Sequence, residues 1–407
     1  MPVARPQAGG PGAWGSPSYR LRNGQAEGVA CDTMPPLMFP FTACRRLGAC
    51  AVMVVLVAAP SSLRAQTASS ETIISGAGAA TYPSLEIRGF TDVDYVSSDS
   101  AGLPQGFQLG QFVLHFTSPL ARKVTFFGEV SMSPLADQFH IEVERSFIRY
   151  DYNDLFKISA GRYHTPIGYW NTAFHHGLWL QTTVRRPEQV KVGGTFVPVH
   201  FLGLLAEGKL PSSGLGLSYA AGVGNGRDEV LSRDGDAGDA NTNRAWLAQL
   251  VARPFNVYGL EAGGAVYRDL LPRARLPGGA AQSSVGEWIF SAHLVWTHES
   301  PELIGEFIGV RHEPQGTIES YDSRSFYIQG AYRLPGWANK LKPYSRYEQM
   351  EIAGGDPIYS FPDLQIVTAG VRVDLIDVAA IKAEYRNELA EGAGRWNAIL
   401  LQACLTF

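Results

Sequence analysis

The side chains best suited to chemistry lie in the segment His164–Thr195, which combines several aromatic residues with Arg185, Arg186 and Lys191. A long loop that carries so many aromatic side chains is usually folded against another part of its protein. Clustered Arg and Lys side chains attract anions through their charge. The chemistry that this segment favours is therefore electrostatic guidance of an ion, with no bond made or broken.

Two other groups of residues have the types found in metal sites or in hydrolase active sites. His175 and His176 are adjacent, but no Asp, Glu or Cys stands at a metal-ligand spacing from them, so we predict no metal site. Ser146, His115 and Asp151 have the residue types of a hydrolase triad. Because triads are recognised by geometry and their spacing here is not distinctive, a hydrolase remains only an alternative.

The elements that must position these residues are strands. From Tyr82 onward the chain repeats segments of approximate period two, each followed by a break, which is the pattern of half-buried strands. We predict strands at 82–96, 105–117, 123–132, 139–151, 155–163, 196–208, 214–223, 244–254, 257–268, 286–299, 302–313, 324–334, 340–352, 364–376, 379–388 and 396–407. Their number is even, as bacterial outer-membrane barrels require.

The breaks between these strands differ in length on the two sides. Those after even-numbered strands are tight, as at Tyr152–Asp154 and Ser300–Pro301, whereas most of the others are long and rich in Gly, Asp, Asn and Pro. Short turns at one end and long loops at the other are typical of membrane barrels. We therefore predict an all-β fold, a transmembrane antiparallel β-barrel of about 16 strands whose long third loop folds into the lumen. A β-sandwich is the competing fold.

The two faces of the predicted strands have opposite chemistry. In 364–376, Val367 and every second residue to Leu375 form an apolar row, and Arg372 lies on the other face. In 379–388, Lys382 and Arg386 alternate with apolar residues. An Arg or Lys facing lipid at mid-bilayer costs about 2–4 kcal/mol, so these charges are expected to face a wet interior. Near Arg145 the apolar positions change parity, which predicts a β-bulge.

The last segment also favours a closed barrel. Phe407, Leu405, Ala403, Leu401 and Ile399 fall on one face of a strand that runs to the final residue. A barrel in lipid needs its last strand paired to its first, because an open edge in hydrocarbon finds no water to bond to.

The N-terminal region has the features of a secretory leader. Arg45 and Arg46 precede a short apolar run that ends near Ala65, too short to cross a bilayer as a helix. We predict a misassigned upstream extension at 1–37, a signal peptide at 38–65, a flexible tail at 66–81 and the transmembrane barrel at 82–407. Export fits the cysteine content, because only Cys404 follows the leader and no disulfide or thiol metal centre can form.

Charge argues against one class of partner. Because six of the basic and two of the acidic residues lie before residue 66, the remainder carries 28 basic against 36 acidic side chains, a net of −8. That balance predicts no nucleic-acid binding.

The stretch Gly161–Gly168, the aromatic third loop and the terminal Phe407 together resemble the phosphate-selective porin O and P family over most of residues 82–407. The resemblance implies a trimeric porin whose inward Arg and Lys side chains guide anions. The positions that match this role are Arg145, Arg149, Lys157, Arg162, Arg185, Arg186 and Lys191. Arg372, Lys382 and Arg386, which strand alternation places inside, complete the candidate pore residues.

We therefore expect an outer-membrane porin that passes small hydrophilic solutes or ions, with anions such as phosphate preferred. Its expected partners are those solutes, outer-membrane lipid and two further copies of the chain. Passive diffusion needs no catalytic residue and no cofactor, and we predict neither. The alternatives are an outer-membrane barrel hydrolase and a secreted β-sandwich binding protein.

Overall fold

The computed structural model describes residues 82–100, 105–135, 138–191, 196–228, 231, 235–272 and 283–407. The predicted extension 1–37, signal peptide 38–65 and tail 66–81 lie outside the described residues. Within the described part, no helix is long and apolar enough to span a bilayer.

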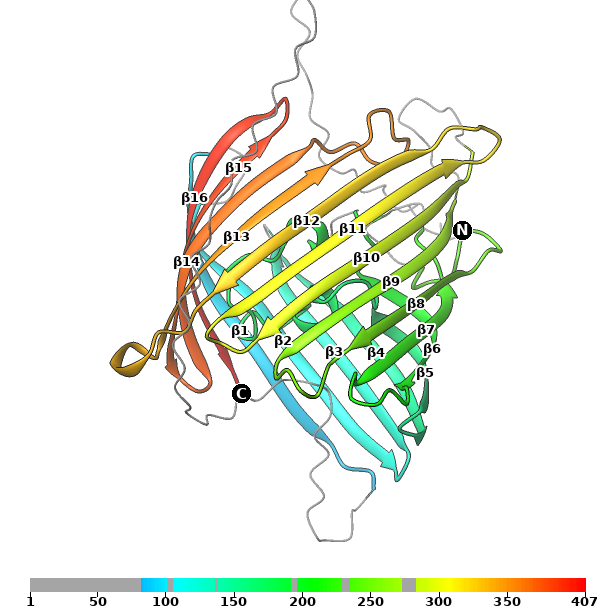
Figure 1. Cartoon of the computed structure of the whole chain (residues 1–407), viewed down its shortest axis with the longest axis horizontal. Helices are drawn as coiled ribbons and strands as arrows, with labels where there is room; N and C mark the ends of the chain where they lie inside the picture. The colour runs from blue at the N-terminus through cyan, green and yellow to red at the C-terminus, as the bar shows by residue number, and fades with distance from the viewer. Residues whose placement is uncertain are drawn as a thin grey trace, which may run out of the picture. The chain divides into compact units, whose positions relative to one another are not determined.

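All sixteen predicted strands are present, with ends that differ from the expected ones by a few residues (Figure 1). Their bounds are β1 (Glu86–Ser98), β2 (Gly106–Ala121), β3 (Val124–Leu135), β4 (Gln138–Asn153), β5 (Phe156–His164), β6 (His200–Lys209), β7 (Leu217–Asn225), β8 (Ala245–Ala252), β9 (Leu260–Leu271), β10 (Val285–Thr297), β11 (Glu302–Pro314), β12 (Tyr321–Ala331), β13 (Leu341–Glu351), β14 (Leu364–Ile376), β15 (Ala379–Ala390) and β16 (Gly394–Thr406). Three short helical turns are α1 (Trp170–Ala173), η1 (Glu188–Val190) and η2 (Gly336–Ala338).

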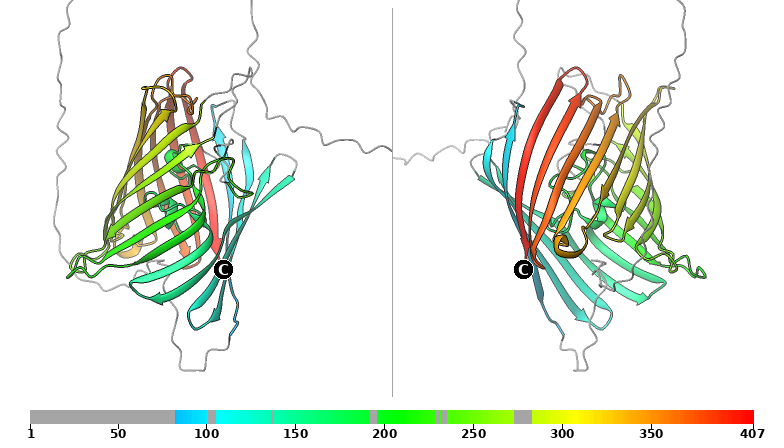
Figure 2. Two further views of the ribbon diagram at one scale, coloured as in Figure 1. Left: turned by 90° about the vertical axis from the view of Figure 1, so that its right-hand side faces the viewer. Right: turned by 60° about the vertical axis from the view of Figure 1, so that its left-hand side comes forward.

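Each strand pairs antiparallel with its neighbours in sequence, and β1 pairs with β16, so the sheet is a closed barrel (Figure 2). The terminal residue completes the seam: the backbone N–H of Phe407 donates to the Gly89 carbonyl at 3.0 Å, and the Gly89 N–H donates to the Phe407 carbonyl at 2.9 Å. Closure leaves no unpaired strand edge. The β-sandwich alternative is therefore wrong.

The alternation of faces is also confirmed. In β14, Val367 is 48% exposed on the outside, whereas Thr368 and Arg372 are buried on the inside. In β16, Leu401 and Leu405 are exposed, and Gln402 between them is buried. An apolar outside and a polar inside are what a barrel in lipid requires.

The predicted β-bulge lies in β4 at Glu144. Pairing with β3 jumps from Glu129↔Arg145 to Val130↔Val143, so Glu144 is the extra residue. Arg162 of β5 holds the bulge, because its Nη1 donates to the carbonyls of Val143 at 2.5 Å and of Glu144 at 2.9 Å. The bulge turns the carboxylates and cations that follow it toward the inside of the barrel.

A glycine beside the bulge gives a testable prediction. Gly161 has φ +146°, and a Cβ there would lie 2.1 Å from the carbonyl oxygen of Ser146. We expect Gly161→Ala to lower the free energy of unfolding by at least the roughly 1–3 kcal/mol of such backbone strain. Denaturant unfolding in lipid vesicles measures it. Gly305→Ala, whose Cβ would meet nothing closer than 3.9 Å, is the control, and equal losses in the two variants would contradict this explanation.

The third loop, called L3 here, joins β5 to β6 and comprises residues 165–199. Its Ile167, Trp170 and Val190 are at most 1% exposed, and they belong to one apolar cluster with residues of the inner wall. The wall residues of that cluster include Tyr267 of β9, Ile289 of β10 and Tyr327 of β12. The burial of its aromatics holds L3 inside the barrel, where its helical turn is visible in Figure 1.

Candidate functional site: the third loop in the barrel lumen

L3 is fastened to the inner wall first at its start. The carboxylate of Glu306 in β11 accepts hydrogen bonds from the backbone N–H groups of Tyr169 and Trp170, both at 2.8 Å, and from the Tyr327 hydroxyl. Glu306 is 3% exposed. Hydrogen bonds to a buried carboxylate are about twice as strong as neutral ones, so Glu306 is a principal anchor of the loop.

Three further wall carboxylates hold the later part of L3. Glu302 of β11 accepts from the Thr182 hydroxyl at 2.9 Å, and Glu384 of β15 accepts from the Val184 N–H at 2.8 Å. Glu348 of β13 accepts from the Glu188 N–H at 2.6 Å. Strand alternation predicts that these four carboxylates lie inside the barrel, but nothing in the sequence pattern predicts that the loop reaches them.

Two predicted pore cations lie under L3. Arg372 of β14 donates to the carbonyls of Trp179 at 2.5 Å and Gln181 at 3.0 Å. Lys382 of β15 donates to the Thr183 carbonyl at 3.0 Å and also to that of Leu178. They are 8% and 0% exposed. Both point inward as predicted, but they bind the loop instead of lining open lumen.

Arg386 of β15 is likewise enclosed, at 5% exposed. It forms ion pairs with Glu188 of L3 at 3.2 Å and with Glu388 at 2.8 Å. Burial alone would raise the pKa of Glu188, but Lys191 and Arg386 outweigh it and hold that pKa below its ordinary value. Glu188 therefore stays ionised and neutralises Arg386.

The L3 cations divide into two kinds. Arg186 is a brace inside the loop, since its guanidinium donates to the Val190 carbonyl at 3.1 Å and to that of His175. Burial lowers the pKa of Arg186 to about 10, which leaves it charged at neutral pH. Arg185 and Lys191 are exposed. No described residue forms a hydrogen bond or ion pair with the Arg185 side chain, and Lys191 pairs with Glu188 at 2.7 Å while 59% exposed.

The remaining predicted cations, on β4 and β5, all lie beside acidic groups. Arg145 pairs with Glu129, Arg149 pairs with Asp151 at 2.7 Å, and Lys157 lies opposite Glu207 in the β5–β6 ladder. Arg162 pairs with Glu142 and Asp236, each at 2.9 Å. At 7% exposed, Arg162 is enclosed between the β4 bulge and the β7–β8 loop, so it does not line open lumen.

The histidine pair of L3 has close neighbours from distant parts of the chain. His175 and His176 lie against Glu144 of the β4 bulge, together with His164 at the end of β5 and His200 at the start of β6. Burial and the neighbouring imidazoles hold the pKa of His175 well below its ordinary value, so its ring is uncharged at neutral pH. Sequence spacing gave no signal, because the partners come from three other elements.

The hydrolase triad does not assemble. Ser146 alternates with Phe147, whose ring packs on Tyr163 inside the barrel with 5.1 Å between centroids. Ser146 therefore faces the opposite side of the sheet from His115, whose Nε2 lies 3.0 Å from the Glu129 carboxylate. Asp151 is engaged by Arg149.

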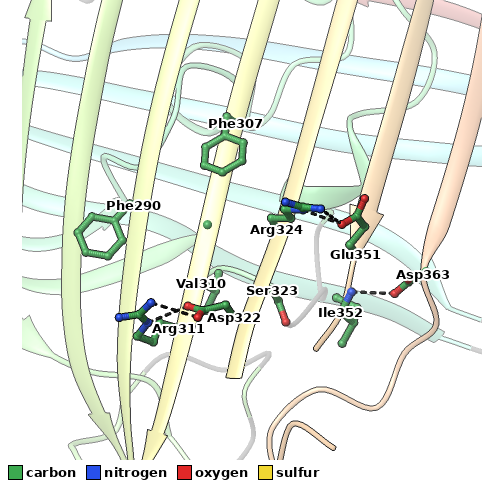
Figure 3. A pocket seen from close by; sticks show the side chains of 11 residues that line it. Phe290, Phe307, Val310, Arg311, Asp322, Ser323, Arg324, Glu351, Ile352 and Asp363 are labelled. Carbon is green, nitrogen blue, oxygen red and sulfur yellow. Dashed lines mark hydrogen bonds and ion pairs between the residues drawn. The ribbon is translucent and has the colours of Figure 1, made fainter. Parts of the chain in front are cut away.

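On the outer wall, a shallow pocket near the loop ends of β10–β13 combines apolar and charged side chains (Figure 3). Phe290 and Phe307 are exposed there, and the ion pair between Arg311 and Asp322 at 2.7 Å crosses from β11 to β12. Outward charges are costly at mid-bilayer but nearly free at its surface. The ion pair between Arg311 and Asp322 therefore lies at the edge of the apolar band on the outer wall.

A closed barrel of sixteen strands, with an apolar outer face and L3 folded inside, is the architecture of outer-membrane barrels. The sequence matches no protein-family profile and no curated protein sequence. The resemblance to the phosphate-selective O and P family therefore has no support at the family level.

Solved structures share the fold at low identity. An anion-selective porin from Comamonas acidovorans superposes with a TM-score of 0.58 at 12% identity, covering 80% of this chain and 100% of that one. OmpT, an outer membrane protein of Vibrio cholerae, in its trimer form, gives 0.52 at 15% identity, with 80% and 100% covered. The outer membrane channel DcaP of Acinetobacter baumannii gives 0.55 at 11% identity, with 80% and 98% covered. At such identities the likeness shows the fold alone.

Proposed function

We propose that this chain is an outer-membrane porin, a passive channel for small hydrophilic solutes, and not an enzyme. The observation that carries the proposal is a closed barrel with an apolar outer face, a charged inner face and a long loop folded inside. Such a barrel offers a wet path through lipid, and L3 narrows that path. The three solved relatives, described as a porin, an outer membrane protein and a channel, support the same class.

Planar lipid bilayers test this proposal. Purified full-length protein is expected to insert in discrete, equal steps of conductance, in proportion to the protein added. Silent membranes together with ester hydrolysis by the same preparation would favour the barrel hydrolase instead. Silent membranes without hydrolysis, from protein shown to be folded, would also reject a porin.

The preference for anions is a finer proposal. Among the described residues of L3 up to Lys191, the charged residues that are exposed are Arg185 and Lys191, both cations, whereas the Glu188 side chain is only 19% exposed. The wall cations are largely neutralised by carboxylates, so the preference is expected to be modest. Phosphate itself is the anion that the O and P resemblance implies, and a phosphate-dependent block of chloride current would test it.

Arg185 gives the sharpest test of the charge on L3. A unit charge about 6 Å away in water stabilises a passing anion by about 0.7 kcal/mol and destabilises a passing cation by as much, so Arg185→Ala is expected to lower the anion-to-cation permeability ratio by up to about tenfold. Reversal potentials in a gradient of dilute salt measure the ratio, because screening weakens the effect at high salt. Arg395→Ala serves as the control. It removes an exposed cation of β16 that lies on the opposite face of the strand from the inward-facing Gln402. An unchanged ratio in Arg185→Ala would place Arg185 outside the ion path.

Two further parts of the proposal concern export and assembly. Residues 38–65 are proposed to direct export, and residues 66–81 to form a tail before the barrel, which N-terminal sequencing of the mature protein tests. A homotrimer is proposed because a solved relative is a trimer. Its mass in detergent, measured by light scattering, distinguishes three copies from one.

A further inference from the structure

Four imidazoles and one carboxylate converge where L3 meets β4, β5 and β6. The candidate ligand atoms of His164, His175, His176 and His200 all lie within 4.8 Å of one another. The Glu144 carboxylate is 3.0 Å from His176 Nε2, 2.9 Å from His200 Nε2 and 4.0 Å from His175 Nε2. The side chain of Glu144 is 2% exposed and those of the histidines at most 5%.

Three of the ring nitrogens that meet there have no hydrogen-bond partner. They are the Nε2 atoms of His164, His175 and His176, all buried and without a hydrogen-bond partner among the described residues. Each buried acceptor left this way costs about 1–3 kcal/mol. Buried acceptors gathered within 4.8 Å of one another favour a bound ligand between them.

The outer ring nitrogens fix which atoms carry protons. Nδ1 of His175 lies 2.7 Å from the Asn171 amide oxygen, and Nδ1 of His176 lies 3.1 Å from the Gln111 amide oxygen. Because an amide oxygen only accepts, both Nδ1 atoms must donate, and in the neutral ring each Nε2 then presents a lone pair. In that state lone pairs face the oxygen atoms of Glu144, and acceptors gathered in this way repel one another unless a cation lies between them.

His200 differs from the other three rings. The Arg162 guanidinium, a donor only, lies 3.2 Å from His200 Nδ1, which places the ring proton on Nε2 beside Glu144. His200 is thus the neighbour that positions Glu144. The ligand set consists of Glu144 and three imidazoles, each with an outer-sphere partner or a neighbouring ring that orients it. His164 belongs to the set because its ligand atom lies within 4.8 Å of those of His175 and His176, and its ring is stacked on that of His175 with 3.8 Å between centroids.

We propose that His164, His175, His176 and Glu144 bind one divalent transition-metal ion of the imidazole-preferring group, such as Zn²⁺. Zinc binds imidazole nitrogen at about 2.0–2.1 Å, which sets neighbouring ligand atoms roughly 3–3.5 Å apart. The 3.0 Å between Glu144 and His176 Nε2 matches that spacing, and the imidazole ligand atoms, all within 4.8 Å of one another, would draw together around the ion. Neutral imidazoles suit Zn²⁺, Ni²⁺ and Cu²⁺, whereas Mg²⁺ and Ca²⁺ prefer oxygen ligands alone.

The ion ties the loop to the wall. His175 and His176 belong to L3, whereas Glu144 and His164 belong to β4 and β5, so one bound ion cross-links the loop to the strands from which it departs. The proposed role of the ion is structural: it holds L3 against the barrel wall and takes no part in transport.

Metal content tests the proposal directly. The full chain, prepared without a histidine tag and stripped with a chelator, is dialysed against micromolar Zn²⁺ and analysed by elemental mass spectrometry. We expect one Zn²⁺ per chain, unaffected by millimolar Mg²⁺ or Ca²⁺. In Glu144→Gln, which keeps the shape of the side chain, and in His176→Ala, we expect the affinity to fall by more than about tenfold.

The control is His293→Ala, which removes a buried histidine of β10 that contacts Glu261 and does not belong to the cluster. It should retain Zn²⁺ as the unchanged chain does. Circular dichroism and heat-dependent migration on gels establish that each variant is folded before its metal content is compared. A folded wild-type barrel that retains no Zn²⁺, Ni²⁺ or Cu²⁺ would overturn the proposal. So would equal binding in Glu144→Gln, His176→Ala and the control, and neither result depends on whether the barrel conducts.

Discussion

Arg162→Met is expected to lower the free energy of unfolding by about 3–5 kcal/mol, the cost typical of breaking a buried ion pair. Arg162 pairs with Glu142 and Asp236 and donates to the two carbonyls that the β4 bulge leaves unpaired. Methionine fills a similar volume but leaves all four acceptors without their donor. Glu142 is 32% exposed and Asp236 is 47% exposed, so solvent compensates in part and the lower end of the range is the better estimate.

Unfolding by guanidinium in lipid vesicles, followed by tryptophan fluorescence, measures this loss. Arg149→Met is the matched control. Arg149 is an inward-facing cation of β4, but it pairs with only one carboxylate, the partly exposed Asp151. It should lose less than about 1 kcal/mol. If the two variants were equally stable, the bulge would not depend on Arg162. The family resemblance implies that Arg162 lines the pore. A change in ion selectivity without a loss of stability in Arg162→Met would favour that role.

Glu306→Ala is expected to release the start of L3 and to raise single-channel conductance. The substitution removes the acceptor of the Tyr169 and Trp170 N–H groups and of the Tyr327 hydroxyl. Each donor left unsatisfied in a buried place costs about 1–3 kcal/mol, so the bound position of the loop loses several kcal/mol relative to a detached one. A detached loop narrows the lumen less and fluctuates more.

Planar bilayer recordings reveal both consequences, a larger mean current and more noise in the open channel. Glu207→Gln changes an inward carboxylate on β6 that lies opposite Lys157 and serves as the control. Its conductance should stay near that of the unchanged chain. Identical currents in Glu306→Ala and wild type would show that L3 is held by its apolar contacts alone.

Much of the architecture follows from the sequence because it depends on local rules. Period-two alternation gave all sixteen strands, and the sorting of short turns and long loops gave the barrel. The parity change between Val143 and Ile148 located the bulge in β4, and both side chains are exposed on the outer face as that change requires. The aromatic content of 164–195 placed the third loop inside. Each of these signals is carried by residues close together in the chain.

The roles of individual side chains were decided only by the tertiary structure. Alternation shows that Arg372 and Lys382 point inward, yet only the path of L3 shows that its carbonyls cover them. The histidine cluster joins β4, β5, L3 and β6, and no spacing rule connects residues that far apart. Contacts between distant segments depend on how the loop packs, and packing is a property of the closed barrel as a whole. The sequence determined the barrel and the direction of its faces, and the fold decided which charges remain free in the lumen.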